Sequence, residues 1–311
     1  MATRRALVRI NGRVTQLPAA DTLAGAGMVR FTEERHDESP NDAAPVHSIT
    51  PVGSETSIDF AIVSKGSGAL TLSVPDGTSA GGNKRGSRAV DLQMLRFNPT
   101  QVASGGHSFI GAGRYNTAGG SYSAVVGGER NTSSGVNSMS WGFDNLADAS
   151  NATCVGGQYL TTRGLNSAVA EGNSDSARGA NQVRRVTLRR IAADATATAL
   201  TANGGSESGS NTIILPVNSA FHCRVRVVAR NTVTNTCKSW EGKALVKRLT
   251  AASSVTIIGS TITGDYGESG LSACVVAFGV NTTLGSFSVN ATGISGQSIR
   301  WTAQVDMVEC A

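Results

Sequence analysis

The chain has 311 residues, a formal net charge of +5, 37 glycines and only 5% aromatic residues. This length allows two or three domains, and the shortage of aromatic side chains predicts thin hydrophobic cores. No apolar run reaches the ~18 residues of a membrane-spanning helix. Arg9 and Arg13 interrupt the segment that would have to be the apolar part of a secretory signal. We therefore expect neither membrane insertion nor export.

The cysteines and histidines are arranged in no metal-binding or disulfide pattern. The five cysteines are an odd number without Cys-x-x-Cys spacing, and the four histidines are scattered. We predict no metal, no cofactor and mostly buried free cysteines, although Cys223 and Cys237 could face each other across a hairpin. The positions concerned are Cys154, Cys223, Cys237, Cys274, Cys310, His36, His47, His107 and His222.

The first hundred residues contain few strong signals. Residues 6–10 and 13–17 alternate around Asn11-Gly12, which predicts a hairpin with a type I′ turn. Residues 19–57 lack periodicity, so we expect either an irregular segment or one that becomes ordered at an interface with a partner. Strands are expected at 57–64 and 69–74, and 89–97 fits either a short helix or a strand.

A glycine-rich stretch at 81–86 lacks the spacing of a phosphate-binding loop and no helix pattern follows it, so we do not expect nucleotide binding. We expect its glycines to let several chains converge near an axis.

A five-fold repeat of 15 residues follows, between Ser104 and about Ala180. Such a short period accommodates two short strands and two turns, which predicts an all-β solenoid. One column of equivalent positions is small and polar, the next is apolar, and a third is glycine-rich and predicts sharp corners. The columns are Ser108, Ser123, Ser138, Thr153 and Ala168; Phe109, Ala124, Met139, Cys154 and Val169; and Ala112, Gly127, Gly142, Gly157 and Gly172.

Asparagines near the other corner are predicted to adopt the left-handed conformation that Asn tolerates: Asn116, Asn131, Asn145 and Asn173. A single coil of this width buries too little apolar area to offset the entropy of ordering its backbone. We therefore expect several chains to pack around a common axis.

Residues 181–311 change character and contain alternating runs separated by turns. They predict strands at 183–191, 212–217, 223–229, 243–249, 255–263, 273–280, 286–291 and 299–308. About eight strands at this spacing indicate an antiparallel β-sandwich of jelly-roll type.

The run ASGGHSFIGAGRYNTAGGSYSAVVGGERNTSSGVNSMSWGFDN resembles the rungs of bacteriophage tail fibre proteins, which are similar to the left-handed parallel β-roll heads of trimeric bacterial adhesins. The segments 65–96 and 1–18 also resemble parts of phage tail proteins. The resemblance covers residues 1 to about 180 and implies a homotrimeric virion fibre, assembled in the host cytoplasm. The last 131 residues carry no such motif.

The expected fold class is all-β, a trimeric left-handed β-roll shaft with a C-terminal sandwich knob. Residues 1–56 are expected to attach to the phage tail or baseplate. A β-rich shoulder follows at 57–103, the roll at 104–180 and the knob at 181–311. The alternative is a purely structural fibre or baseplate component without receptor contact.

All of the excess charge lies in the last region. Residues 181–311 hold 12 Lys or Arg and 7 Asp or Glu, whereas residues 1–180 hold 15 of each. A basic distal domain favours encounter with acidic surface glycans, although the alternating arginines 224, 226 and 230 also fit a solvated strand face. Nucleic-acid binding would require interleaved aromatic residues. Partners are thus expected to be a bacterial surface glycan or protein.

Aromatic rings near carboxylates are the usual carbohydrate contacts. We predict receptor contacts at Trp240, Tyr266, Asp265 and Glu268, with inter-subunit packing as the alternative for Trp240 and a core position for Trp301. The acidic residues of the repeat are dispersed in polar surroundings, and no Gly-x-Ser-x-Gly motif is present. We therefore expect no catalytic residues and a protein that is not an enzyme.

Overall fold

The computed structural model describes residues 7–10, 13–16, 31–36, 38, 43–44, 46–51, 56–57, 59, 61–173 and 177–311. The described chain is almost entirely β-structure. Its helical segments are two 3-10 turns, η1 (Ala252–Ser254) and η2 (Ser269–Leu271), and no helix among these residues could cross a membrane. The chain divides into two compact units, residues 1–63 and 64–311.

The first unit contains two separate hairpins. Strands β1 (Leu7–Ile10) and β2 (Arg13–Gln16) pair antiparallel, which confirms the predicted hairpin, and its Asn11-Gly12 turn lies outside the described residues. Strands β3 (Phe31–His36) and β4 (Val46–Pro51) also pair antiparallel. The expectation of an irregular segment is wrong there. Backbone pairing and polar cross-strand contacts, such as 2.8 Å between His36 Nε2 and Ser48 Oγ, leave no apolar alternation to detect.

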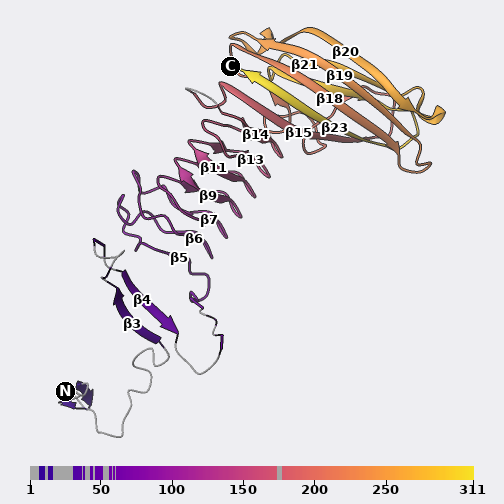
Figure 1. The fold of residues 1–311 in the computed structure, drawn as a ribbon. Coiled ribbons are helices and arrows are strands. Elements are labelled where there is room, and N and C mark those ends of the chain that lie inside the picture. Colours follow the sequence, from indigo (N-terminus) through magenta and orange to yellow (C-terminus); the bar gives the residue numbers. More distant parts are fainter. Residues whose placement is uncertain are drawn as a thin grey trace. The chain divides into compact units, whose positions relative to one another are not determined.

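The second unit begins with a β-solenoid of about five turns, whose strands stack one above the next in Figure 1. Its main parallel sheet consists of β5 (Leu70–Thr71), β6 (Val90–Asp91), β7 (Phe109–Ile110), β9 (Ala124–Glu129), β11 (Met139–Phe143), β13 (Thr153–Val155) and β14 (Val169–Glu171). A second parallel sheet consists of β8 (Thr117–Ala118), β10 (Thr132–Ser133) and β12 (Leu146–Ala147). The repeat therefore forms the predicted solenoid.

Parallel pairing starts earlier than the sequence repeat. Leu70–Thr71 pairs in parallel with Val90–Asp91, which pairs with Phe109–Ile110. The described positions of 57–64 form no strand, so the strand expected there is wrong, and 89–97 contains a short strand and no helix. Gly81 and Gly86 meet this chain's own backbone: a Cβ on Gly81 would lie 2.0 Å from the carbonyl oxygen of Val74, and one on Gly86 would lie 2.2 Å from that of Gly105.

The repeat is not strictly 15 residues long. Met139 pairs with Thr153, which follows it by 14 residues, and Thr153 pairs with Val169, which follows by 16. Thr153, and not Cys154, therefore belongs to the apolar column. The register shifts at an irregularity between Ser140 and Gly142, so a fixed period misassigned this turn by one residue, which reverses the face of each side chain.

The interior and exterior of the main sheet are both apolar. Ile110, Val125 and Cys154 point inward and are fully buried. Phe109, Val126 and Val155 belong to the outer columns and are 38%, 51% and 38% exposed. The apolar column predicted from the repeat thus faces outward.

The predicted glycine corners are confirmed, except that the first two lie one residue later, at Gly113 and Gly128. Gly128 has a φ of +93°, and a Cβ there would lie 2.0 Å from the carbonyl oxygen of Gly142. Only glycine satisfies both the left-handed conformation and this close approach.

The corner asparagines have a different role from the predicted one. The left-handed residues are those directly before them, and Asn116, Asn131 and Asn145 are fully buried. The Oδ1 of each accepts a backbone N–H one turn on: Asn116 from Asn131 at 2.9 Å, Asn131 from Asn145 at 3.2 Å and Asn145 from Leu160 at 2.8 Å. The side-chain amides thereby satisfy backbone groups that the narrow corner cannot pair otherwise.

Strand β14 pairs antiparallel with β15, and from there the sheet continues as antiparallel strands in the order β15-β23-β18-β19-β20. A separate 4-stranded sheet contains β16, β22, β17 and β21. All eight predicted strands are present, and the short β16 was missed. The strands are β15 (Asn181–Ala192), β16 (Thr198–Ala199), β17 (Ile213–Ile214), β18 (Ser219–Asn231), β19 (Cys237–Arg248), β20 (Thr256–Gly267), β21 (Val275–Asn281), β22 (Ser286–Thr292) and β23 (Ile299–Cys310).

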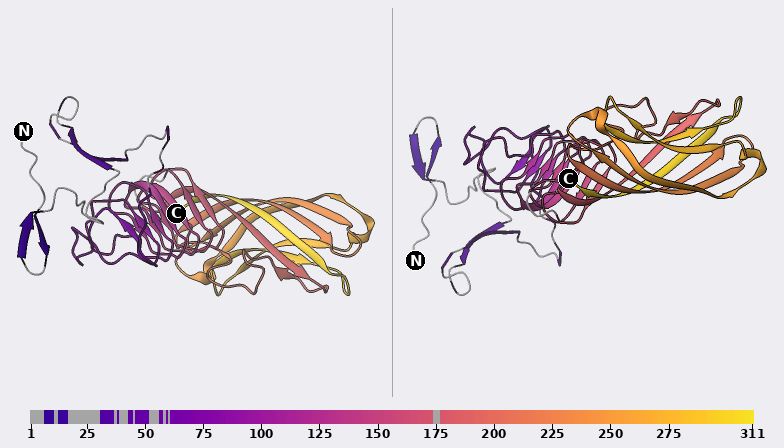
Figure 2. Two further views of the ribbon diagram at one scale, coloured as in Figure 1. Left: turned by 90° about the horizontal axis from the view of Figure 1, so that it is seen from below. Right: turned by 90° about the horizontal axis from the view of Figure 1, so that it is seen from above.

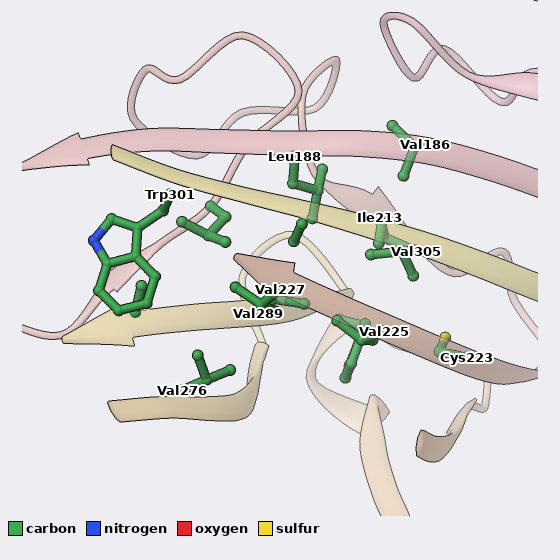
Figure 3. Packing of buried hydrophobic residues seen from close by; sticks show 14 of the residues in the cluster. Val186, Leu188, Ile213, Cys223, Val225, Val227, Val276, Val289, Trp301 and Val305 are labelled. Carbon is green, nitrogen blue, oxygen red and sulfur yellow. The ribbon is translucent and has the colours of Figure 1, made fainter. Parts of the chain in front are cut away.

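Both C-terminal sheets contribute to one hydrophobic cluster. Val225 and Trp301 come from one sheet, and Val276 and Val289 from the other. Figure 3 shows these side chains between the strands, and Figure 2 shows the long strands of this region from two further directions. Trp301 is fully buried, which confirms its predicted core position.

A buried ion pair lies where the solenoid meets these strands. Arg184 Nε donates to Glu309 Oε1 at 2.6 Å, and Arg163 Nε to Glu309 Oε2 at 2.8 Å. Arg184 Nη1 also donates to the carbonyl of Thr162 in the solenoid at 3.0 Å. Burial lowers the pKa of Arg184, and the charge of Glu309 opposes this effect.

Candidate functional site

Trp240 does not present a free aromatic face. It lies within β19 and is only 6% exposed, and its ring stacks on Trp301 with the centroids 5.4 Å apart. Lys238 Nζ lies 5.0 Å from the centroid of the same ring. The sequence predicted Trp240 near a turn, and the structure places it inside the strand that begins at Cys237. Its indole is part of the core.

Tyr266 and Glu268 share a shallow groove of about 300 Å³, which we call the tyrosine groove; Cys237, Lys238 and Ser239 also line it. Tyr266 is 82% exposed, whereas Glu268 Oε2 accepts the backbone N–H of Cys237 at 2.6 Å. Lys238 donates to the carbonyls of Ser272 and Cys274. Tyr266 is therefore the exposed ring of this groove.

Asp265 belongs to β20, one residue before Tyr266, and its side chain lies outside the described part of the structure. Its role as a contact residue stays a prediction, as do those of Tyr266 and Glu268.

A second surface, missed from the sequence, follows one corner of the solenoid. The residues directly before the three buried asparagines, Tyr115, Arg130 and Asp144, are left-handed with φ of 61°, 59° and 53°. Tyr159, which precedes Leu160 at the equivalent position of the next turn, is left-handed as well with φ of 55°. Left-handed backbone is costly for such residues, and the regular asparagine positions could have located them in the sequence.

These side chains contact one another from turn to turn. The guanidinium carbon of Arg130 lies 6.0 Å from the ring centroids of both Tyr115 and Phe143, within the range of cation–π contacts. Phe143 and Tyr159 meet edge-on with centroids 5.4 Å apart. Rings and a guanidinium thus alternate along the corner.

A groove of about 490 Å³ opens on this corner, and we call it the corner groove. Phe97, Tyr115, Arg130, Asp144 and Arg178 line it, and Phe97 is 75% exposed. Arg178 Nε donates to Asp144 Oδ1 at 3.0 Å. Exposed rings can cover the apolar faces of a sugar, while the guanidinium donates to and the carboxylate accepts from its hydroxyls.

The cysteines with perturbed pKa values lie outside these grooves. Burial raises the pKa of Cys154 and of Cys223 to about 12, so both are protonated thiols at neutral pH. All five cysteines are free, and Cys237 and Cys310 are exposed, contrary to the general expectation of burial. Among the described residues, no group of three or more His, Cys, Asp or Glu is placed to hold a metal.

No protein-family model and no curated protein matches this chain. Two solved structures are similar at 10% sequence identity. One is a tailspike protein from the Acinetobacter baumannii bacteriophage Fri1, a capsular polysaccharide depolymerase, with a TM-score of 0.29, covering 83% of this chain and 49% of that one. The other is the tailspike protein of Acinetobacter baumannii phage AM24, with a TM-score of 0.20, covering 78% and 52%.

The chain therefore spans about half the length of the tailspike proteins it resembles. The first of them is described as a depolymerase, which is an enzyme. The prediction that this protein is not an enzyme conflicts with that description and is withdrawn.

Proposed function

We propose that this protein is a phage tail protein that recognises polysaccharide on the bacterial host surface, by binding it or by depolymerising it. The observation that carries the proposal is the corner groove. Its side chains Tyr115, Arg130 and Asp144 come from equivalent positions of successive solenoid turns, and a surface built from successive turns suits a repeating polymer. The rung sequence resembles that of phage tail fibres, which supports a virion location for this surface.

The proposal includes a homotrimer with a left-handed shaft. Its support is the outward-facing side of the main parallel sheet, where Phe109, Val126 and Val155 are exposed. We call this surface the outer face. Leu72 and Met94, in the first turns, are also 58% and 70% exposed. Contiguous apolar surface of this kind marks an interaction site, and sister chains around a common axis would cover it.

The remaining assignments complete this arrangement. Residues 1–56 attach the protein to the tail, 57–103 form the shoulder, 104–180 the shaft and 181–311 a sandwich knob that approaches the host. The shared hydrophobic cluster of the two C-terminal sheets supports the sandwich. The excess positive charge of 181–311 favours its encounter with an acidic surface.

A polysaccharide assay tests the function. Purified protein is incubated with capsule from a panel of encapsulated bacteria, and we measure both bound glycan and glycan chain length. Tyr115→Ala together with Arg130→Ala should reduce binding at least about tenfold, since a ring contact and a charged hydrogen bond are each lost.

Shortened glycan would assign depolymerisation, and bound but intact glycan would assign binding. Protein that binds no capsule and labels only tail particles would overturn the proposal in favour of a purely structural component. The matched control is Tyr122→Ala, because Tyr122 is 60% exposed but lies outside the corner groove.

A further inference from the structure

A third groove, of about 590 Å³, lies at the junction of β15, β23 and the loop at Asn203-Gly204. Three arginines line it, Arg189, Arg190 and Arg300, and we call it the arginine groove. We propose that this groove binds an anionic sugar unit of the host polysaccharide. The inference rests on the proposed function and adds a second site with a defined ligand charge.

The three guanidinium groups contact backbone carbonyls or no acceptor at all among the described residues. Arg190 Nη1 donates to the carbonyl of Gly205 at 2.8 Å, and Arg189 Nη2 to that of Asn203 at the long distance of 3.5 Å. Within the described ranges, none of the three forms an ion pair with a carboxylate. Other arginines of the same sheet are paired with Glu or Asp: Arg184 and Arg185 of β15, and Arg224 and Arg226 of β18.

The strand register concentrates this charge further. Arg300 lies directly opposite Arg230 of β18 on one side and opposite Ile191 of β15 on the other. Like charges at directly opposed positions are destabilising, and Arg230 is held by a neutral partner, Asn235 Oδ1 at 2.5 Å. A bound anion would remove this repulsion.

The groove also offers apolar surface. Ile191 lines it and is 58% exposed, although it is flanked by charged residues. Trp301 is also among the lining residues, but its side chain is fully buried and offers no surface to a ligand. Apolar surface beside guanidinium groups suits a sugar ring that carries a carboxylate or a phosphate. A nucleic acid would need an exposed ring for base stacking, and Trp301 is fully buried.

The test uses the full chain and four labelled oligosaccharide probes. Hyaluronan and polygalacturonate fragments carry carboxylates, a phosphorylated mannose oligosaccharide carries phosphate, and dextran is neutral. We expect binding of at least one anionic probe and none of dextran. The variant Arg189→Gln/Arg300→Gln should weaken that binding by at least about tenfold, because charged hydrogen bonds are lost.

Two further variants test whether the position and geometry of the arginines determine binding, and not net charge or an altered fold. Lys243→Gln/Lys247→Gln removes the same charge from exposed positions of β19 and should leave affinity within about twofold. Arg300→Lys keeps the charge but loses the bidentate geometry, and should weaken binding severalfold. Unchanged thermal unfolding of each variant shows that the fold is intact.

Three results would overturn the inference: no anionic probe binds, dextran binds equally well, or a single-stranded oligonucleotide binds with the same affinity and the same loss in the variant. The capsule assay on the same variant distinguishes the two proposals. Full capsule binding by Arg189→Gln/Arg300→Gln would leave the proposed function standing and remove this site, whereas wild-type protein that binds no capsule would remove the proposed function.

Discussion

At the scale of single residues, Asn131 shows how one side chain holds adjacent turns of the solenoid together. Its Nδ2 donates to the carbonyls of Gly127 at 3.1 Å and Gly142 at 2.8 Å, and its Oδ1 accepts the N–H of Asn145. The side chain is fully buried. Each of these backbone groups would otherwise be unsatisfied in a place that water cannot reach.

Replacing this residue tests the role of the asparagine column. Asn131→Ala should lower the free energy of unfolding by about 2–4 kcal/mol, because buried backbone donors and acceptors lose their partner. Urea unfolding followed by circular dichroism measures the change. The control, Ser134→Ala, alters an exposed position of the same turn and should change stability by less than about 0.5 kcal/mol. Equal effects of the two substitutions would contradict the assigned role.

At the scale of elements, Glu309 of β23 connects the solenoid to the C-terminal strands. Its carboxylate accepts from Arg184 and Arg163 and from Gln182 Nε2 at 2.8 Å. Arg184 in turn reaches Thr162. Since Arg184 and the carboxylate are both completely buried, removing one charge leaves the other without compensation.

Glu309→Gln should therefore destabilise the protein by about 3–5 kcal/mol, as expected for a broken buried ion pair. Calorimetric and urea unfolding would measure this loss. Glu241→Gln is the matched control, since its partner Arg224 is 54% exposed, and exposed pairs contribute about 1 kcal/mol or less. A loss no larger than the control's would show that this contact does not stabilise the junction.

At the scale of the whole molecule, the outer face determines what a single chain leaves uncovered. The turns carry inward and outward apolar columns on the same strands, and only the inward column is buried within one chain. Exposed apolar strands invite uncontrolled association, and a symmetric assembly of sister chains removes that exposure.

Charges on this face should break the assembly. The wild-type protein, with a chain mass of 31.9 kDa, is expected to have the mass of three chains in native mass spectrometry. Val126→Asp/Val155→Asp should dissociate it, because carboxylates would be buried in an apolar contact. Val217→Asp/Val233→Asp introduces the same charges at exposed positions elsewhere and should leave the mass unchanged. A monomeric wild-type protein would refute the trimer.

The sequence by itself determined the elements that rest on local patterns. The glycine-cornered repeat predicted the solenoid, side-chain alternation predicted eight C-terminal strands, and Asn11-Gly12 predicted the first hairpin. In each case the pattern is a property of neighbouring residues, because side-chain alternation and turn conformation are set over a few positions. The core position of Trp301 followed from the same alternation.

Only the tertiary structure decided which residues meet. Trp240 and Tyr266 are both aromatic residues near strand ends in the sequence, yet one stacks on Trp301 and the other is exposed. The shift from 15-residue to 14-residue and 16-residue turns moved Cys154 from the outer column to the interior. Strand register and burial depend on pairings between strands that are distant in the sequence, and so do the corner groove and the arginine groove. No local sequence pattern encodes these pairings.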